Sequence, residues 1–358
     1  MSRARTFADL ATASEAGSLA SPNMIINGDM AVAQRATSAT GLGASTGYHT
    51  VDRFATEFTT SGRMTQSQAA ITDLPGFKYA LKCDCTTADT SVDAAEYTLI
   101  NHRMEGYTVN GLASGTSSAK KSTVSFYVKG NASATYVLEL IKAGDRHINK
   151  TFSVTTSWSR VSITFDGDTT TQLAQDNTQE LSVNIWLHAG SNYTSGSLQT
   201  SWGSYVAANR AVGISSFFDS TDRELFITGM QYELGEVATP FKHESYADNL
   251  ARCQRYFQIS GTARTYGIVA NQHTATTCYS NLRWWQLMRA APTVTIGATS
   301  DYNVYNATEN ITISDIDAGQ ITANSCELYA TTSSRTAGTA THINTNGDTT
   351  FWKADSEL

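Results

Sequence analysis

The feature that most constrains the fold is a series of short segments in which apolar and polar residues alternate. The clearest of these segments are residues 123–129, 136–141, 160–165 and 181–188. Successive side chains of a strand point to opposite faces, so each segment predicts a strand with one apolar face. Gly, Asn and Asp cluster between the segments and indicate tight turns. Such signals run from Met24 to about Pro240 without intervening helices, which predicts a jelly-roll β-sandwich.

The composition agrees with an all-β chain. Of the 358 residues, 51 are Thr and 37 are Ser, and 25 Gly accompany only 4 Pro. Charged residues make up 16% of the chain, below the roughly 25% of an average globular protein, which argues against a coiled coil. The net charge is −7, so we expect no nucleic-acid partner. Apolar runs are shorter than the roughly 18 residues of a membrane span, so we expect no membrane insertion.

One segment has helical spacing. Ser245 can cap a helix whose apolar stripe would comprise Tyr246, Leu250, Cys253 and Phe257. We expect this short helix, residues 245–257, to link two β domains.

The helix defines the expected domain boundaries. A jelly-roll domain would occupy residues 22–244, and a smaller C-terminal β domain would occupy residues 258–358. Residues 1–21 have no apolar run typical of a signal peptide and are interpreted as an N-terminal attachment arm. The five cysteines show no disulfide or zinc spacing and are interpreted as buried free thiols.

Motifs that suggest catalysis lack the rest of their sites. Residues 43–47 match the G-x-S-x-G nucleophile elbow but lie in a loop-like run with no helix behind them. Residues 166–168, Asp-Gly-Asp, lack the other ligands of a calcium loop and are interpreted as a solvated turn. A glycosidase needs a pair of carboxylates, and nothing selects a pair among Glu139, Glu224, Glu233 and Glu236. We therefore expect no catalytic residue, no metal and no cofactor.

Four sets of segments resemble phage tail-fibre and receptor-binding proteins, especially those of marine phages. They are residues 23–35 with 48–54, residues 190–196 with 200–202 and 209–210, residues 226–241 with 246 and 253–257, and residues 288–294 with 352–358. The most specific is Phe226-Ile-Thr-Gly-Met-Gln-Tyr-Glu-Leu-Gly-Glu-Val-Ala-Thr-Pro-Phe241. The first and third sets are also similar, more distantly, to jelly-roll carbohydrate-binding modules. Thr228-Gly229 stands where those modules carry paired aspartates, so their calcium site is not transferred.

The resemblance implies a non-enzymatic tail-fibre protein of a phage virion, assembled in the host cytoplasm, that binds a glycan of the host cell surface. It also implies a homotrimer whose residues 1–21 contact other tail proteins. Two alternatives stay open: a purely structural virion adaptor or head decoration, and a polysaccharide depolymerase.

The candidate glycan-binding residues lie on and after one strand. In residues 181–188 the odd positions form a core face, and Asn184, Trp186 and His188 face away from it. Aromatic faces and amides are groups that bind sugars. Trp186 either contacts sugar or is covered by a loop or a subunit. Three aromatic residues follow in a Gly/Ser-rich segment, namely Tyr193, Trp202 and Tyr205, and packing is favoured for Tyr193.

A rival site lies in the C-terminal domain. Its candidates are Tyr279, Trp284 and Trp285. Alternation places the two tryptophans on opposite faces, so one would fill the core while the other is exposed or lies at a subunit contact.

Overall fold

The computed structural model describes residues 23–261, 267–305, 310–333, 335–346 and 350–358. The chain divides into two compact units, Met1–Asn249 with Leu358, and Leu250–Glu357. Every strand pair among the described residues is antiparallel, and the predicted all-β fold is confirmed. The expected attachment arm, residues 1–21, lies outside the described residues.

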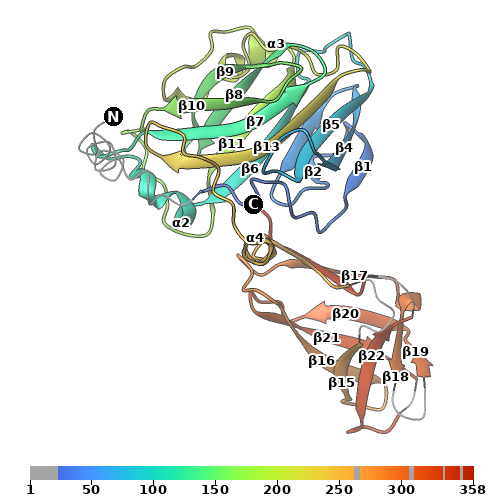
Figure 1. The fold of residues 1–358 in the computed structure, drawn as a ribbon. Helices are drawn as coiled ribbons and strands as arrows, with labels where there is room; N and C mark the ends of the chain where they lie inside the picture. The colour runs from blue at the N-terminus through green and yellow to red at the C-terminus, as the bar shows by residue number, and fades with distance from the viewer. Residues whose placement is uncertain (1–22, 262–266, 306–309, 334, 347–349) are drawn as a thin grey trace. The chain divides into compact units, whose positions relative to one another are not determined.

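The first unit is a jelly-roll sandwich of two sheets (Figure 1). The six-stranded sheet has the order β1 (Ser38–Leu42), β4 (Arg63–Ala70), β5 (Tyr79–Thr87), β13 (Glu224–Leu234), β7 (Ser122–Gly130), β10 (Ser159–Phe165). The seven-stranded sheet has the order β12 (Gly203–Ser204), β9 (Arg146–Val154), β8 (Ala134–Lys142), β11 (Gln179–Ala189), β6 (Tyr97–Glu105), β3 (Ala55–Thr59), β2 (Gly47–Tyr48). Side chains of both sheets share one core, which includes Phe126, Ile185 and Ile227.

Short helical turns join these strands. They are α2 (Gly106–Val109), η1 (Asn110–Leu112), α3 (Ser191–Thr194) and η2 (Ala207–Asn209). Of the nucleophile-elbow match, residues 43–46 lie between β1 and β2 and Gly47 begins β2, with no helix after them, as expected for a chance match.

The second unit contains two further antiparallel sheets. A three-stranded sheet has the order β14 (Phe257–Ile259), β23 (Trp352–Asp355), β17 (Thr293–Ile296). A seven-stranded sheet has the order β19 (Asn310–Thr312), β18 (Tyr302–Tyr305), β22 (Ala340–Thr345), β15 (Gly267–Gln272), β16 (Thr277–Arg283), β21 (Ser325–Thr331), β20 (Asp315–Gly319). A short turn, η3 (Thr299–Asp301), precedes β18. The unit has its own core around Leu328, Ile343 and Trp352.

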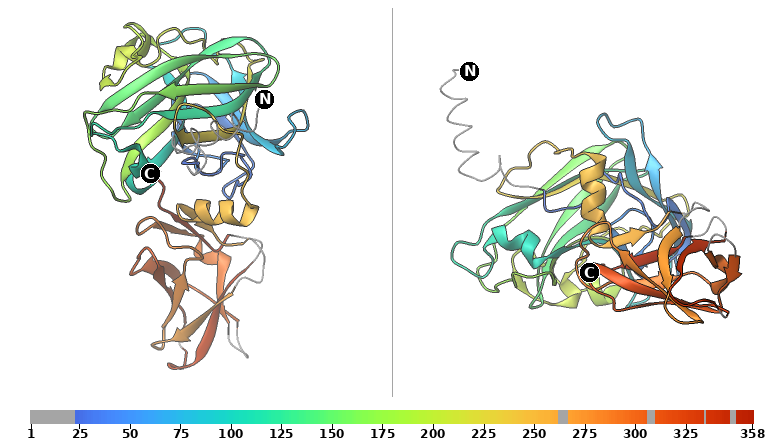
Figure 2. Two further views of the ribbon diagram at one scale, coloured as in Figure 1. Left: turned by 60° about the vertical axis from the view of Figure 1, so that its left-hand side comes forward. Right: turned by 90° about the horizontal axis from the view of Figure 1, so that it is seen from below.

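Helix α4 (Tyr246–Gln254) is the longest helix among the described residues (Figure 2). Ser245 caps it as predicted, since its Oγ accepts a hydrogen bond from the Asp248 amide at 3.1 Å. The predicted extent is wrong at the C-terminal end, because Phe257 begins strand β14. The predicted stripe is also wrong at Tyr246, whose side chain is 60% exposed. The boundary between the two units falls within this helix, after Asn249.

All five cysteines are buried free thiols, as predicted. Burial raises the pKa of Cys83 to about 12, so this thiol stays protonated and unreactive at neutral pH. No helix in the described part of the chain is both long and apolar enough to cross a membrane.

Two segments that carry the family resemblance lie side by side in the first unit. The Met24 amide donates to the Tyr232 carbonyl at 3.0 Å, and the Met230 amide donates to the Gly28 carbonyl at 2.8 Å. Asn23 reinforces this pairing, because its amide nitrogen donates to the Met230 carbonyl at 3.0 Å. The opening segment is therefore fastened to β13, the last strand of the sandwich.

We predict that Gly28→Ala destabilises the first unit. A Cβ atom at residue 28 would lie 2.1 Å from the carbonyl oxygen of Met230, so the two segments would have to separate. We expect a loss of about 1–3 kcal/mol in the free energy of unfolding, measured by urea denaturation. Gly47→Ala is the control, since its nearest neighbour would lie at an ordinary 3.5 Å. Equal unfolding midpoints for the two variants would contradict the prediction.

Candidate functional site

The predicted alternation along β11 is confirmed from Leu181 to Leu187 and fails at His188. Leu181, Val183, Ile185 and Leu187 all lie in the sandwich core. Asn184 and Trp186 lie on the opposite, outer face of the seven-stranded sheet. The strand register places Asn184 opposite Asn101 of β6 and Glu139 of β8, and Glu139 opposite Asn149 of β9. Directly opposite residues share a face, so one row of polar side chains crosses four strands.

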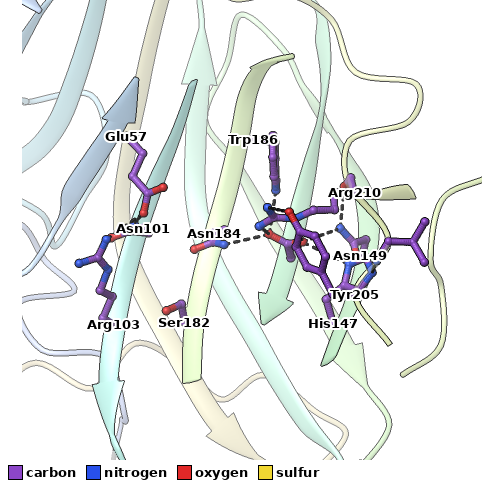
Figure 3. Close-up of polar contacts among 12 residues, drawn as sticks. Glu57, Asn101, Arg103, His147, Asn149, Ser182, Asn184, Trp186, Tyr205 and Arg210 are labelled. Atoms are coloured by element: carbon purple, nitrogen blue, oxygen red, sulfur yellow. Dashed lines mark hydrogen bonds and ion pairs between the residues drawn. The ribbon is translucent and has the colours of Figure 1, made fainter. Parts of the chain in front are cut away.

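Glu139 is the centre of this outer face, because it accepts hydrogen bonds from Asn149, Asn184, Trp186 and Arg210, which are labelled in Figure 3. Its side chain is fully buried, and both oxygens accept hydrogen bonds from Arg210, Nε to Oε1 at 2.7 Å and Nη2 to Oε2 at 2.6 Å. Asn184 Nδ2 and Trp186 Nε1 each donate to Oε2 at 2.9 Å. Asn149 Nδ2 donates to Oε1 at 3.3 Å. A buried carboxylate with this many donors is a structural anion.

The electrostatics of Glu139 follow from these contacts. Burial on its own raises the pKa of this carboxyl, but the contacts of His147 and Arg210 outweigh it and hold the pKa at about 2, below the usual 4.5. His147 Nδ1 lies 3.3 Å from Oε1. The group is therefore ionised throughout the physiological range.

Trp186 is not an exposed sugar contact. Its side chain has no exposed surface, and the guanidinium carbon of Arg210 lies 4.6 Å from its ring centre. Tyr193 packs against it with ring centres 5.4 Å apart, and Ala211 covers it further. The cause is the segment after β11, residues 190–217, which returns over the outer face. Cover by a neighbouring loop, one of the two alternatives for Trp186, is confirmed, as is the favoured packing role of Tyr193.

Tyr205 lies at the edge of this cover and is 40% exposed. Its hydroxyl accepts a hydrogen bond from Arg210 Nη1 at 3.2 Å, and the Arg210 guanidinium carbon lies 5.0 Å from its ring centre. Its amide donates to the Asp145 carbonyl at 2.7 Å. An exposed aromatic ring is thus held in place by the arginine that neutralises Glu139.

The polar face continues beyond β11 toward the other edge of the sheet. Asn101 Nδ2 donates to Glu57 Oε1, and Arg103 Nη2 pairs with the same oxygen at 2.9 Å. The side chains of Arg103 and Glu57 are 22% and 25% exposed. Figure 3 shows the two groups, Glu57–Asn101–Arg103 and Asn184–Arg210, on the same face of the sheet.

Three amide oxygens on this face have no hydrogen-bond partner among the described residues. They are the Oδ1 atoms of Asn101, Asn149 and Asn184. Amide oxygens accept hydrogen bonds from hydroxyl groups, and the buried ones cost free energy while they remain unpaired. The face therefore holds unused acceptors beside an ionised carboxylate and an arginine.

His188, a predicted member of the site, lies elsewhere. A bulge in the β11–β6 register separates it from Trp186. Its ring is fully buried, with Nδ1 2.8 Å from Ser216 Oγ and with Phe218 packed edge-on at 5.4 Å. The prediction that it faces a sugar beside Trp186 is wrong, because the bulge places His188 opposite Thr98, whose other cross-strand neighbour, Phe58, lies in the sandwich core.

Trp202, another predicted member of the site, lies apart from both the Glu139 network and His188. Its Nε1 donates to the Asp166 carbonyl at 2.7 Å, and Lys142 Nζ lies 5.5 Å from its ring centre. Asp168 pairs with Lys142 at 2.5 Å and Arg146 at 2.9 Å, and its side chain is 3% exposed. Burial raises the pKa of Asp168, but these two cations outweigh it and hold it at about 2. The prediction of a solvated turn is therefore wrong for Asp168.

The two tryptophans of the rival site in the second unit differ in exposure, as predicted. Trp284 is buried in the core, whereas Trp285 is 47% exposed. Both rings contact Trp352, at centroid distances of 5.4 and 5.3 Å. Tyr279 is partly buried against Tyr329. Trp285 is thus the exposed member of this set.

Sequence reasoning considered Glu139 only as one of four carboxylates of a possible glycosidase, and it named Arg210 only as part of a segment that carries the resemblance. One signal was present: Glu139 alternates with Leu138 and Leu140, so it had to lie on the outer face of its strand. Arg210 carried no such signal, because its position depends on the path of the returning segment.

Comparisons with known proteins give a limited result. No family model and no curated protein matches the chain. One similar solved structure is TmCBM61 in complex with β-1,4-galactotriose, at 9% identity over 59% of this chain and 97% of that chain, with a TM-score of 0.29. Another is a family 11 carbohydrate-binding module from Clostridium thermocellum with a β-1,3-1,4-mixed-linked tetrasaccharide, at 10% identity over 57% and 99%, with a TM-score of 0.27.

A third structure matches most of both chains. It is the tandem CBM22-1–CBM22-2 domain of Paenibacillus barcinonensis Xyn10C, at 10% identity over 94% of this chain and 96% of that chain, with a TM-score of 0.29. Because these TM-scores are low, conclusions about function rest on the residues of this chain alone.

We predict that Glu139→Gln destabilises the protein in a pH-dependent way. At pH 7 we expect a loss of about 3–5 kcal/mol, because the substitution leaves the Arg210 charge buried without its partner. The pKa of Glu139 is lower in the folded chain, about 2, than its usual 4.5. Its stabilisation is therefore complete above about pH 5 and is lost as the pH falls toward 2.

The measurement is urea unfolding of wild type and variant at pH 7, 5 and 3. The difference between wild type and variant in the free energy of unfolding should become smaller as the pH falls. Glu236→Gln is the control, because that carboxylate is 65% exposed and pairs only with the surface Lys121 among the described residues. A gap of constant size from pH 7 to pH 3 would exclude the charge as its cause.

Proposed function

We propose that this chain is a non-enzymatic tail-fibre protein of a phage virion and that it binds a glycan of the host cell surface through the outer face of its seven-stranded sheet. The observation that carries the glycan-binding part is Tyr205, an aromatic ring 40% exposed and fixed by Arg210 beside unpaired amide oxygens.

The chemistry of the face suits a sugar. An aromatic ring stacks on the C–H patches of a pyranose, while amide, carboxylate and guanidinium groups bind its hydroxyls. Tyr205 supplies the ring, and Arg210, whose side chain is 12% exposed, supplies a polar group beside it. Because the Glu139 pair and the strand register hold these groups in place, little conformational entropy is lost on binding.

The protonation state of Glu139 and Asp168 supports a binding role over glycoside cleavage. A glycosidase needs a carboxylic acid whose pKa is raised so that it donates a proton near neutral pH. Burial raises the pKa of two other acids, Asp29 and Asp52, but Glu139 and Asp168 have pKa values of about 2. Both act as fixed anions for neighbouring arginine or lysine side chains.

The virion part of the proposal rests on the sequence resemblance. The segments that carry it include the opening segment, β13 and the region of α4. Within this proposal residues 1–21 attach the chain to other tail proteins, and the glycan-binding surface faces the host. A structural adaptor or head decoration would share the fold but would not bind host cells.

We predict that Tyr205→Ala lowers binding of the purified full-length protein to host cells at least about tenfold, as expected for loss of an aromatic anchor. Tyr205→Phe keeps the ring and should retain most of the binding. Tyr107→Ala is a matched control, because Tyr107 is also exposed, at 61%, but lies on α2. Trp285→Ala tests the rival site and should leave binding unchanged.

Four outcomes would count against this assignment. Loss of binding in Trp285→Ala alone would move the site to the second unit. If both variants are folded and neither substitution weakens the saturable binding, aromatic glycan recognition is refuted. Absence of saturable binding by the wild type would favour the structural alternative, and release of reducing ends from host polysaccharide would favour the depolymerase.

We further predict that the full-length protein is a homotrimer. Fibre proteins of the family it resembles commonly form trimers, and the second unit exposes several apolar side chains, among them Val269 at 69%, Trp285 at 47% and Leu287 at 57%. Light scattering should give three times the chain mass of 38.6 kDa. A stable monomer at micromolar concentration would contradict the prediction.

A further inference from the structure

Three side chains that the glycan-binding face does not use converge at the end of β11. His188 comes from that strand, and Asp89 and Glu96 come from the connection between β5 and β6. Their side chains are 0%, 4% and 9% exposed, respectively. One ligand atom from each lies within 4.8 Å of the others.

The distances between these atoms suit a shared ion better than direct hydrogen bonds. His188 Nε2 lies 3.9 Å from Asp89 Oδ2 and 3.9 Å from Glu96 Oε2, which is too long for a hydrogen bond. Two ligands each about 2.1 Å from a zinc ion lie about 3.4 Å apart at the tetrahedral angle and at most about 4.2 Å apart. The observed separations fall within this range.

The orphaned nitrogen points to a ligand independently of the two acids. His188 Nε2 is fully buried and has no hydrogen-bond partner among the described residues. An unpaired polar atom in a buried place costs free energy. Likewise, no Lys or Arg of the described chain lies within ion-pair distance of Asp89 or Glu96, whose only ion-pair neighbour there is His188.

The groups around the triad hold each ligand in position. His188 Nδ1 lies 2.8 Å from Ser216 Oγ, which fixes the ring and directs Nε2 at the two acids. Glu96 Oε1 accepts from the Ser61 amide and Oε2 from the Asp93 amide, both at 2.9 Å. Hydrogen bonds of this kind orient the ligands of metal sites.

Gly190 allows the acid-bearing connection to approach β11. A Cβ atom at residue 190 would lie only 1.9 Å from the Asp93 carbonyl oxygen. The Gly190 amide donates to the Glu96 carbonyl at 2.8 Å. The backbone thus fixes the separation of Glu96 and His188 before any ion binds.

We propose that Asp89, Glu96 and His188 form a structural site for a divalent transition-metal ion, with Zn²⁺ as the best match. One imidazole and two carboxylates suit zinc, cobalt or manganese, whereas calcium and magnesium prefer oxygen ligands alone. The burial of all three side chains favours a structural role. The ion would fasten the β5–β6 connection to the end of β11.

The test uses the full-length protein expressed or refolded with Zn²⁺ and then dialysed against metal-free buffer. We expect one zinc per chain by elemental analysis, and intense visible absorption after replacement by Co²⁺, as a four-coordinate site gives. Asp89→Asn, Glu96→Gln and His188→Gln should each weaken Zn²⁺ binding by about 100-fold or more. His273→Gln is the control, because His273 is exposed and lies in the second unit.

Any of the following outcomes would overturn the proposal. One is a folded wild type that retains no zinc, cobalt or manganese above the level of the dialysis buffer. Another is zinc that persists in Asp89→Asn and His188→Gln, or that disappears in His273→Gln. Circular dichroism of every variant separates loss of the site from loss of the fold. A stability that depends on pH but not on metal would identify the triad as a histidine–carboxylate cluster instead.

Discussion

The buried ion pair between Glu139 and Arg210 determines the outer face of the first unit. Glu139 lies within a strand, whereas Arg210 comes from the segment that returns after β11. A buried charge is tolerated only with its partner, so the pair holds the segment against the sheet. The same contact covers Trp186 and leaves Tyr205 at the edge. The position of a single arginine thus decides which aromatic ring is available to a ligand.

The strands could be predicted from sequence better than the surface they present. Alternation along residues 181–188 correctly separated the core side chains from Asn184 and Trp186, because it depends only on strand geometry. Exposure could not be predicted in the same way, because a segment that starts at residue 190 covers the face. The helix was predicted three residues too long, since Phe257 fits a helical stripe and a strand equally well.

Strand β11 combines three environments along its length. Its odd positions fill the core, Asn184 and Trp186 belong to the Glu139 network, and His188 faces two carboxylates at its end. It lies in the middle of the seven-stranded sheet, with β8 and β6 on either side. A central strand is held by hydrogen bonds along both edges, which makes it a rigid support for ligand-binding groups.

The pairing of the opening segment with β13 has a consequence for synthesis. Asn23 and Met230 are separated by 207 positions in the chain, so the opening segment emerges from the ribosome long before β13. Contacts of such separation form late and slow the folding of a domain. The opening segment of the nascent sandwich therefore stays without its partner until almost the whole domain has been translated.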